Sequence, residues 1–201
     1  MPTLVVTTVI IVVAVATSNA SIAAWVHDNG ASKSKRVDAS LVHINQRTGL
    51  REFDGQVFTG FAMRYFADGT VASEEPFVDG RRHGALRRWF PDGELAFDSP
   101  YEAGKRQGVT TSWWLNGNLR SRTRYVNDQP DGVVWHWYRS GAKFKRFQFR
   151  AGQPVGLQQG WRQNGTLFSN FEYRNGRTYG MRNANLCLEL EDEAYVDPTE
   201  T

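Results

Sequence analysis

Residues 60–80 read GFAMRYFADGTVASEEPFVDG, and a segment of the same design begins at residue 84 with GALRRWFPDGELAFDSPYEAG. Three more follow at the same 24-residue interval: GVTTSWWLNGNLRSRTRYVND (108–128), GVVWHWYRSGAKFKRFQFRAG (132–152) and GLQQGWRQNGTLFSNFEYRNG (156–176). We refer to the five segments as blocks 1 to 5. A fixed period between about 20 and 50 residues indicates a stacked repeat architecture. The structure of one block, repeated five times, therefore predicts the fold of this region.

Glycine recurs at two places in every block, one opening the block and one in a central turn. In the turn it follows Asp, Asn or Ser, as in Asp68-Gly69 and Asn116-Gly117. Such dipeptides between extended runs are typical of β-hairpins, because they adopt positive φ angles at low cost. We therefore predict two strands and a turn per block, with the opening glycine at the junction between blocks. The opening glycines are Gly60, Gly84, Gly108, Gly132 and Gly156, and the turn glycines are Gly69, Gly93, Gly117, Gly141 and Gly165.

Alternation of side chains along the strands predicts two different faces. Successive side chains of a strand point to opposite faces. In the second strand of block 2, this alternation puts Leu95 and Tyr101 on one face and Asp98 on the other. Such alternation is typical of a half-buried antiparallel sheet. The predicted fold class is all-β: an elongated single-layer antiparallel β-meander of five hairpin repeats with partial caps. In the first strands, Trp89, Trp113, Trp135, Trp137 and Trp161 are expected to face one way, and Phe66, Phe90, Trp114 and Tyr138 the other.

The segments outside the repeats carry different signals. An uncharged apolar run over residues 4–16, followed by small residues up to Ala20, predicts a secretory signal peptide at 1–20. Extension of the run gives an alternative, a membrane anchor over residues 4–26, about long enough to span a bilayer. We accordingly expect export to the periplasm or the extracellular space, or else anchoring in the membrane. The other predicted boundaries are a linker (21–40), an N-terminal capping half-repeat (41–59), the repeats (60–179), a C-terminal cap (180–190) and an acidic disordered tail (191–201).

The sequence does not contain the residue patterns of common catalytic or metal sites. A single cysteine, Cys187, excludes a disulfide within the chain and a multi-cysteine metal site. The four histidines share no spacing typical of metal ligands, and no nucleophile elbow or phosphate-binding loop occurs. A single-layer sheet also offers no obvious cleft for paired carboxylates. We predict no catalytic residues, no metal, no cofactor and no enzymatic activity.

Basic and aromatic residues gather in blocks 3 and 4, and we take this cluster as the candidate partner-binding surface. Such interleaving can bind anionic lipid, acidic polysaccharide or nucleic acid, although a net charge of +3 does not by itself indicate a nucleic-acid partner. Two other interpretations stay open: a solvated face that keeps the sheet from aggregating, or a surface covered by the acidic tail. The candidates are Arg120, Arg122, Arg124, Lys143, Lys145, Arg146, Trp113, Trp135 and Trp137.

The unit G-x-x-x-x-[WY]-[FWY]-x-x-G-x-[LV] resembles the MORN-repeat variant of bacterial proteins grouped as the YwqK family of toxin–antitoxin system antitoxins. Phe58-Thr59-Gly60 is also similar to that family's lead-in. The resemblance covers residues 41–180, with departures at Asp128, Lys143 and Arg162. It implies a non-enzymatic repeat scaffold whose partner is a protein, namely a cognate toxin. Eukaryotic MORN proteins imply an alternative, an envelope module that binds an anionic membrane surface or an envelope polymer.

Overall fold

The computed structural model describes residues 35–181. These residues belong to the second of two compact units, Ser34–Thr201. The predicted signal peptide, the acidic tail and most of the C-terminal cap lie outside the described residues. Within residues 35–181, no helix has the length and apolar character needed to cross a membrane.

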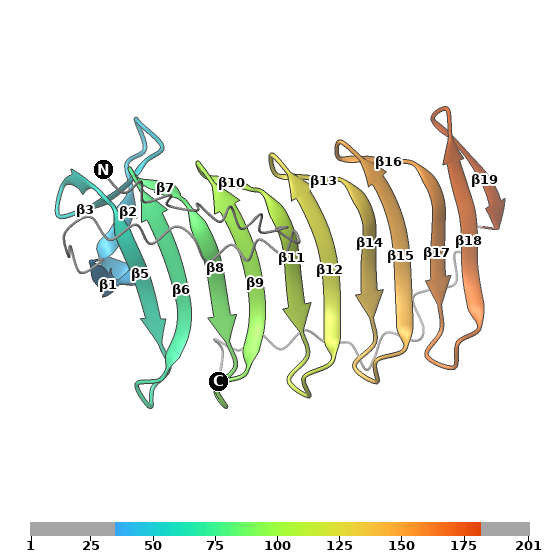
Figure 1. The fold of residues 1–201 in the computed structure, drawn as a ribbon, viewed down its shortest axis with the longest axis horizontal. Coiled ribbons are helices and arrows are strands. Elements are labelled where there is room, and N and C mark those ends of the chain that lie inside the picture. Colours follow the sequence, from blue (N-terminus) through green and yellow to red (C-terminus); the bar gives the residue numbers. More distant parts are fainter. Residues whose placement is uncertain (1–34, 182–201) are drawn as a thin grey trace, which may run out of the picture. The chain divides into compact units, whose positions relative to one another are not determined.

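Each block forms one long antiparallel hairpin, and neighbouring hairpins pair into a single sheet. Figure 1 shows the long strands side by side in the order of the sequence. The prediction of an all-β meander built from hairpin repeats is therefore confirmed. The hairpins are β5 (Gly60–Tyr65) with β6 (Val71–Val78), β8 (Gly84–Trp89) with β9 (Leu95–Glu102), β11 (Gly108–Trp113) with β12 (Leu119–Val126), β14 (Gly132–Trp137) with β15 (Lys143–Arg150), and β17 (Gly156–Trp161) with β18 (Leu167–Arg174).

A second, shorter hairpin follows each long hairpin, and the sequence analysis did not predict it. At the first junction Asp79 and Gly80 have φ angles of 48° and 71°. Positive φ at both residues defines the type I′ turn, whose twist matches that of paired strands. After each turn the chain folds back onto the preceding strand. The returning strands are β7 (Arg81–Arg82), β10 (Lys105–Arg106), β13 (Gln129–Pro130), β16 (Gln153–Pro154) and the longer β19 (Arg177–Met181).

The central turns differ from the junction turns. Among their residues only the glycine has a positive φ, as at Gly69 (85°). The residue before it acts through its side chain: Asp68 Oδ1 accepts a hydrogen bond from the Thr70 backbone N–H at 2.9 Å. The Asp-Gly and Asn-Gly pairs therefore mark the central turns correctly, but by an Asx-turn with one left-handed glycine rather than by two left-handed residues.

The N-terminal end of the sheet corrects the predicted extent of the linker. Residues 36–40 were predicted as linker, but β1 (Arg36–Asp38) pairs in parallel with β5 and leads into a short 3₁₀ helix, η1 (Ala39–Leu41). The capping half-repeat forms a separate sheet of β2 (Val42–Ile44), β3 (Arg51–Phe53) and β4 (Gln56–Val57).

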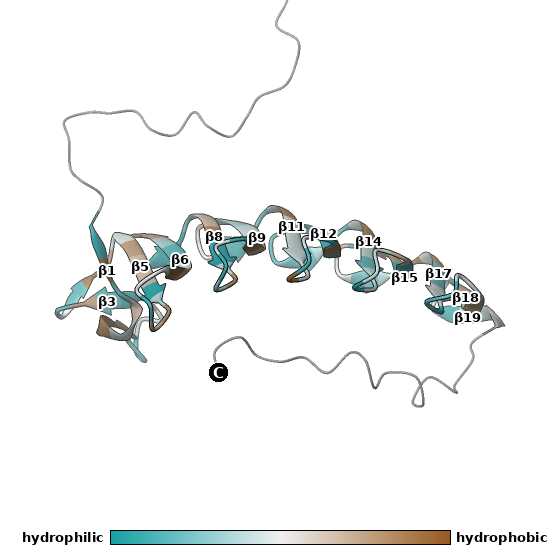
Figure 2. Ribbon diagram, turned by 90° about the horizontal axis from the view of Figure 1, so that it is seen from below, coloured by the Kyte–Doolittle hydropathy of each residue, from teal (hydrophilic) through white to brown (hydrophobic). Residues whose placement is uncertain are grey.

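This small sheet covers one face of block 1 (Figure 2). Val42 and Phe58 pack against Ala62 and Phe77, and all four are buried. At this end of the sheet the first hairpin therefore has a second layer on one side, in addition to the predicted single sheet. The added layer supplies an apolar core that one sheet cannot enclose by itself.

Every long hairpin also contains a β-bulge beside the central turn. In block 2, Arg88 lies opposite Phe97, but Trp89 lies opposite Leu95, which leaves Ala96 as an extra residue. The same shift occurs at the corresponding step of the other four blocks. A bulge of this kind breaks the period of two along the longer strand.

The bulge overturns the predicted facing of the second strands. Residues directly opposite each other share a face of the sheet. Leu95 therefore lies on the face of Trp89 and Asp98, whereas Tyr101, opposite Gly84, lies on the other face. Leu95 and Tyr101 were predicted together because counting by two did not allow for the extra residue.

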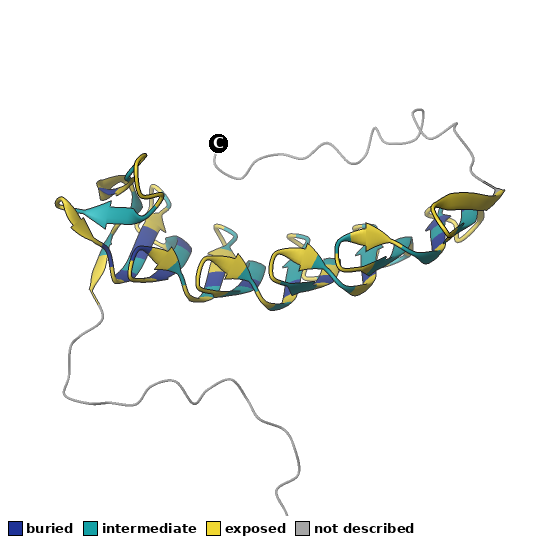
Figure 3. Ribbon diagram, turned by 90° about the horizontal axis from the view of Figure 1, so that it is seen from above, coloured by how far each residue is buried: buried dark blue, intermediate teal, exposed yellow. Residues whose placement is uncertain are grey.

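We name the two faces by their residues. The inner face carries the third residue of each first strand, which is buried in every block: Ala62, Leu86, Thr110, Val134 and Gln158. Figure 3 shows these buried segments recurring along the row of hairpins. The register places all five repeat tryptophans of the predicted row on the opposite face, which we call the tryptophan face.

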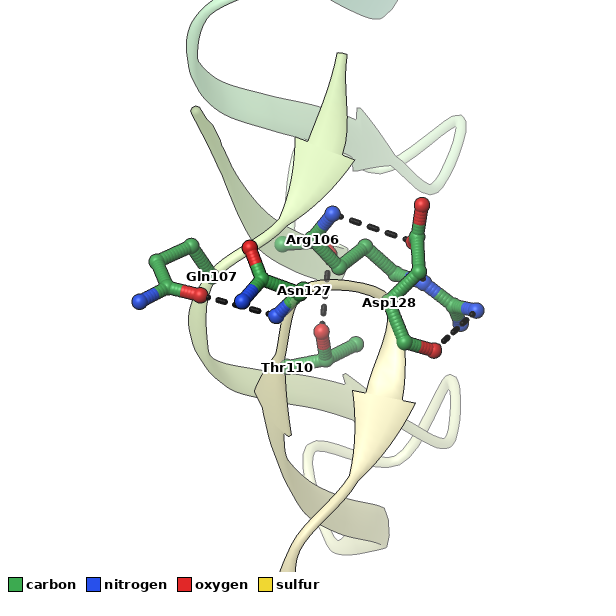
Figure 4. A network of polar contacts seen from close by, with 6 residues as sticks. Arg106, Gln107, Thr110, Asn127 and Asp128 are labelled. Atoms are coloured by element: carbon green, nitrogen blue, oxygen red, sulfur yellow. Dashed lines mark hydrogen bonds and ion pairs between the residues drawn. The ribbon is translucent and has the colours of Figure 1, made fainter. Parts of the chain in front are cut away.

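Hydrogen bonds connect successive junctions, at the end of the long strands where the junctions lie. We call this set of bonds the ladder. The Asp128 N–H donates to the Arg106 carbonyl at 3.0 Å, and the Asn127 N–H donates to Gln107 Oε1 at 2.9 Å (Figure 4). Asp128 stands where the other junctions have glycine, with φ of 68°. Its Oδ1 accepts from the Arg106 backbone N–H and from Arg106 Nε, at 3.0 and 2.9 Å. The departure from the repeat pattern thus adds an ion pair to the ladder.

Neutralising Asp128 tests this ion pair, because Asn tolerates the same left-handed backbone. Burial raises the pKa of the Asp128 carboxyl, but the hydrogen bonds from Arg106 outweigh this effect and leave the pKa below its ordinary value. A carboxylate with a depressed folded-state pKa stabilises the fold above the unfolded pKa and loses that contribution as the pH falls through the folded pKa. We expect Asp128→Asn to lower the free energy of unfolding by about 0.2–1 kcal/mol at neutral pH.

The difference between the variant and the wild type should vanish in acid, below the folded pKa of Asp128. Urea unfolding followed at a series of pH values measures it. A difference that stays constant from neutral to strongly acidic pH would show that the carboxylate charge is not the cause.

Candidate functional site

One row of side chains runs along the middle of the tryptophan face, from block to block. Its members lie opposite each other within each hairpin and between neighbouring hairpins. A ligand lying along the sheet would meet them in order. The row reads Glu74, Arg87, Asp98, Thr111, Arg122, Trp135, Arg146, Gln159 and Asn170.

The charges in the first half of the row are paired. Arg36 Nη2 lies 3.4 Å from Glu74 Oε2, and Arg87 Nε lies 3.2 Å from Asp98 Oδ1. Exposed pairs of this kind contribute about 0–1 kcal/mol each to stability. Their larger effect here is to leave blocks 1 and 2 with compensating charges on this face.

The second half of the row is basic and lacks such compensation. Arg122 and Arg124 form no ion pair with any residue in the described range, and both are exposed. Trp135 lies between Arg122 and Arg146 in the row. The Arg146 guanidinium lies 6.0 Å from the Trp135 ring centroid, and its Nη1 donates to the Leu157 carbonyl at 3.2 Å. Two arginines thus flank one tryptophan on adjacent strands.

Three tryptophans cluster around this point. The ring of Trp135 stacks on that of Trp137, with centroids 5.9 Å apart, and on that of Trp161, at 6.1 Å. Lys143 Nζ lies 5.6 Å from the Trp135 centroid and 6.0 Å from that of Trp161. Cation–π contacts at exposed sites contribute about 0.5–1 kcal/mol. The lysine occupies a position that is leucine in blocks 2, 3 and 5, so this departure places a charge among the rings.

Exposed apolar side chains border the cluster on both sides. Val133 and Leu157 lie along the edge nearest the junctions, and Leu119 and Leu167 lie along the edge nearest the central turns. The sequence analysis did not select these residues. The signal was available, because the second residue of blocks 3, 4 and 5 is Val, Val and Leu at the repeat interval.

The structure divides the residues that were selected from the sequence. Seven of them share the tryptophan face: Arg122, Arg124, Lys143, Arg146, Trp113, Trp135 and Trp137. Lys145 lies opposite His136 on the inner face, with Nζ 4.2 Å from the Phe144 ring centroid. Arg120 is the extra residue of its bulge, and its guanidinium lies 4.7 Å from the Trp114 ring centroid. Closeness in the sequence had grouped these two with the others.

The second aromatic of blocks 3 and 4 connects one block to the next. Trp114 Nε1 donates to the Trp137 carbonyl at 3.1 Å, and the Tyr138 hydroxyl donates to the Trp161 carbonyl at 2.9 Å. Because both carbonyls belong to tryptophans of the cluster, these bonds fix the backbone beneath the rings. A preformed face of this kind reduces the entropy lost when a partner binds.

The inner face carries His136, which lies opposite Lys145. His136 packs edge-on against Phe147, with ring centroids 6.2 Å apart. Burial lowers the pKa of His136, and the nearby charges of Lys145 and Arg120 lower it further. Residues 35–181 also contain no group of three or more His, Cys, Asp or Glu side chains that could hold a metal ion.

Comparison with family models identifies the repeat. Residues 106–127 match the model described as MORN repeat variant. The matched segment contains β11 and β12, one of five hairpins with the same register and the same bulge, which supports a MORN-repeat protein. A search of curated proteins found no match.

The division of Lys143 and Lys145 between the two faces can be tested through His136. Removing a positive charge next to an imidazole makes protonation easier, so Lys145→Gln should raise the pKa of His136. Lys143→Gln removes the same charge from the tryptophan face and should change that pKa less. Titration of the His136 ring protons by NMR measures both effects. Equal shifts in the two variants would contradict the assignment of the lysines to different faces.

Proposed function

We propose that this protein is a non-enzymatic binding module and that its partner docks on the tryptophan face of blocks 3 to 5. One observation carries the proposal: basic residues without acidic partners lie among stacked tryptophans and exposed apolar residues on a single face. The basic residues are Arg122, Arg124, Lys143 and Arg146. Solvated faces that only keep a sheet soluble require charges, but they do not require partly exposed Trp and exposed Val and Leu beside them.

The composition of this face is that of a protein-binding surface. Tryptophan and arginine are enriched among the residues that contribute most to binding at protein interfaces. Contiguous exposed apolar surface also marks interaction sites on soluble proteins. The four cations indicate a partner that presents carboxylates, whose attraction increases the rate of association and falls with salt.

A protein partner is therefore our first candidate, and the resemblance to the YwqK family gives its finer form, a cognate toxin. That finer identity rests on the resemblance and on no particular residue of the face. The second candidate is an anionic membrane surface or an envelope polymer. Tryptophans beside lysine and arginine favour it, because their rings and charges suit the boundary between water and lipid headgroups.

The compartment would separate these candidates. We propose export on the strength of the apolar run at residues 4–16 and the small residues up to Ala20, with membrane anchoring over residues 4–26 as the alternative. Cell fractionation and sequencing of the mature amino terminus test both. A mature protein that starts at Met1 in the cytosol would overturn export and would favour the toxin as partner.

Charge reversal on the tryptophan face tests the binding function. We expect Arg122→Glu/Arg124→Glu/Arg146→Glu to lose at least tenfold in affinity for the partner recovered with the wild type, equivalent to about 1.4 kcal/mol. The matched control is Arg47→Glu/Arg64→Glu/Arg88→Glu, which makes the same change in net charge at exposed residues away from this face, with Arg64 and Arg88 on the inner face of blocks 1 and 2. Affinity chromatography from the native cells, with quantitative mass spectrometry, compares the three proteins.

Sedimentation with anionic vesicles and with wall fragments completes the test. Loss of binding in the face variant but not in the control supports the proposal, and the material that sediments identifies the class of partner. Equal binding of all three proteins to every material would refute the tryptophan face as the binding site.

A further inference from the structure

In the central row of the tryptophan face, the surplus of positive charge lies in blocks 3 and 4. In blocks 1 and 2 the acids of the central row are paired, Glu74 with Arg36 of β1 and Asp98 with Arg87. One block further on, Thr111 stands at the position of Arg87 and Arg122 stands at the position of Asp98. Arg146 occupies the same position in block 4, so the row has no acid in either block. The row is therefore electrically compensated at one end and positively charged at the other. Acidic groups from outside the sheet can pair with the uncompensated arginines.

The chain itself contains a segment of opposite charge. After Arg182 there is no lysine or arginine, and residues 183–201 carry six acidic residues. Leucines occupy alternate positions near the start of this segment, Leu186, Leu188 and Leu190, with Glu189 between the last two. This segment therefore combines carboxylates for the arginines with apolar side chains for the exposed Val133 and Leu157. The acids are Glu189, Glu191, Asp192, Glu193, Asp197 and Glu200.

The described chain ends on the row that carries the surplus. Met181 lies opposite Asn170, which is itself a member of the central row of the tryptophan face. Four inter-strand steps separate β19 from β14 and its Trp135, which is about 19 Å at the usual spacing of strands. The eight residues from Met181 to Glu189 can span about 26 Å when extended. The first acids are therefore within reach of Trp135 and Arg146.

We propose that the acidic segment 189–197 binds the tryptophan face of its own chain, where it contacts Arg122, Lys143 and Arg146. This inference rests on the proposed function, since it concerns the same face. The segment then competes with an external partner for the tryptophan face. An external partner that binds the same residues would resemble the segment, as an acidic chain with interspersed apolar residues. A tethered segment acts at an effective concentration on the order of millimolar, so an external partner must bind more tightly to displace it.

Competition with a synthetic copy of the segment tests the inference. The probe is a fluorescently labelled peptide of residues 186–201, added to the full chain at low salt and followed by fluorescence anisotropy. We expect Glu189→Gln/Glu191→Gln/Asp192→Asn/Glu193→Gln to bind the peptide at least tenfold more tightly than the wild type, because the internal competitor is weakened. Adding Arg122→Glu/Arg146→Glu to that variant should remove the gain.

A pair of smaller variants controls for net charge. Glu191→Gln/Glu193→Gln should tighten peptide binding, whereas Asp54→Asn/Glu94→Gln, which neutralises two exposed acids in turns of the N-terminal sheet and of block 2, outside blocks 3 to 5, should not. Equal effects of the two pairs would overturn the inference, since general electrostatics would then account for the gain.

The remaining outcomes separate this inference from the proposed function. If the wild type and the tail variant bind the peptide equally tightly, the face accepts acidic chains but its own segment does not occupy it, and only the inference fails. If neither binds, the inference also fails, and recovery of the native partner decides the proposed function. If the wild type sediments as a dimer that the tail variant does not form, the segment occupies the face of a second copy, which overturns binding within one chain.

Discussion

One residue in each long hairpin has no partner opposite it, and the composition of both faces depends on that residue. Without the bulge, Lys143 would lie opposite a different residue from Trp137, and Leu119 and Leu167 would leave the side of the tryptophans. The extra residue brings the start of the longer strand onto the face that the end of the shorter strand already occupies. Aromatic, basic and aliphatic side chains therefore meet on one surface.

The parts of this architecture that repeat strictly could be predicted from the sequence. The two sets of glycines define the hairpins, and Asp68-Gly69 and its equivalents define the central turns. The bulge could not be found in this way, because alternation is counted through the strand and one extra residue leaves the composition unchanged. The junction hairpin was missed for a different reason. Two-residue strands are too short to show a pattern, although Asp79-Gly80 and Asn175-Gly176 carry the signal of a type I′ turn.

The candidate site was predicted about as far as composition allows. The arginines and tryptophans of blocks 3 and 4 were selected as a group of basic and aromatic residues, but their division between faces required the register. Lys145 and Arg120 illustrate the limit: they are neighbours of Arg146 and Arg122 in the sequence, yet the structure places them away from the tryptophan face. The departures from the repeat were the better guide. Lys143 and Asp128 break the pattern, and each makes an interaction that its equivalents in other blocks do not make.

The ladder of hydrogen bonds between junctions has a mechanical consequence. Its bonds, like those between the long strands, point along the row of blocks, so tension applied between the two ends would load them in series. Bonds loaded in series open one at a time, at a force set by the weakest step, whereas bonds loaded in shear resist together. The sheet would therefore lengthen by peeling off hairpins singly at low force. A partner bound across blocks 3 to 5 would hold these three hairpins together. Extension under tension would then begin in blocks 1 and 2.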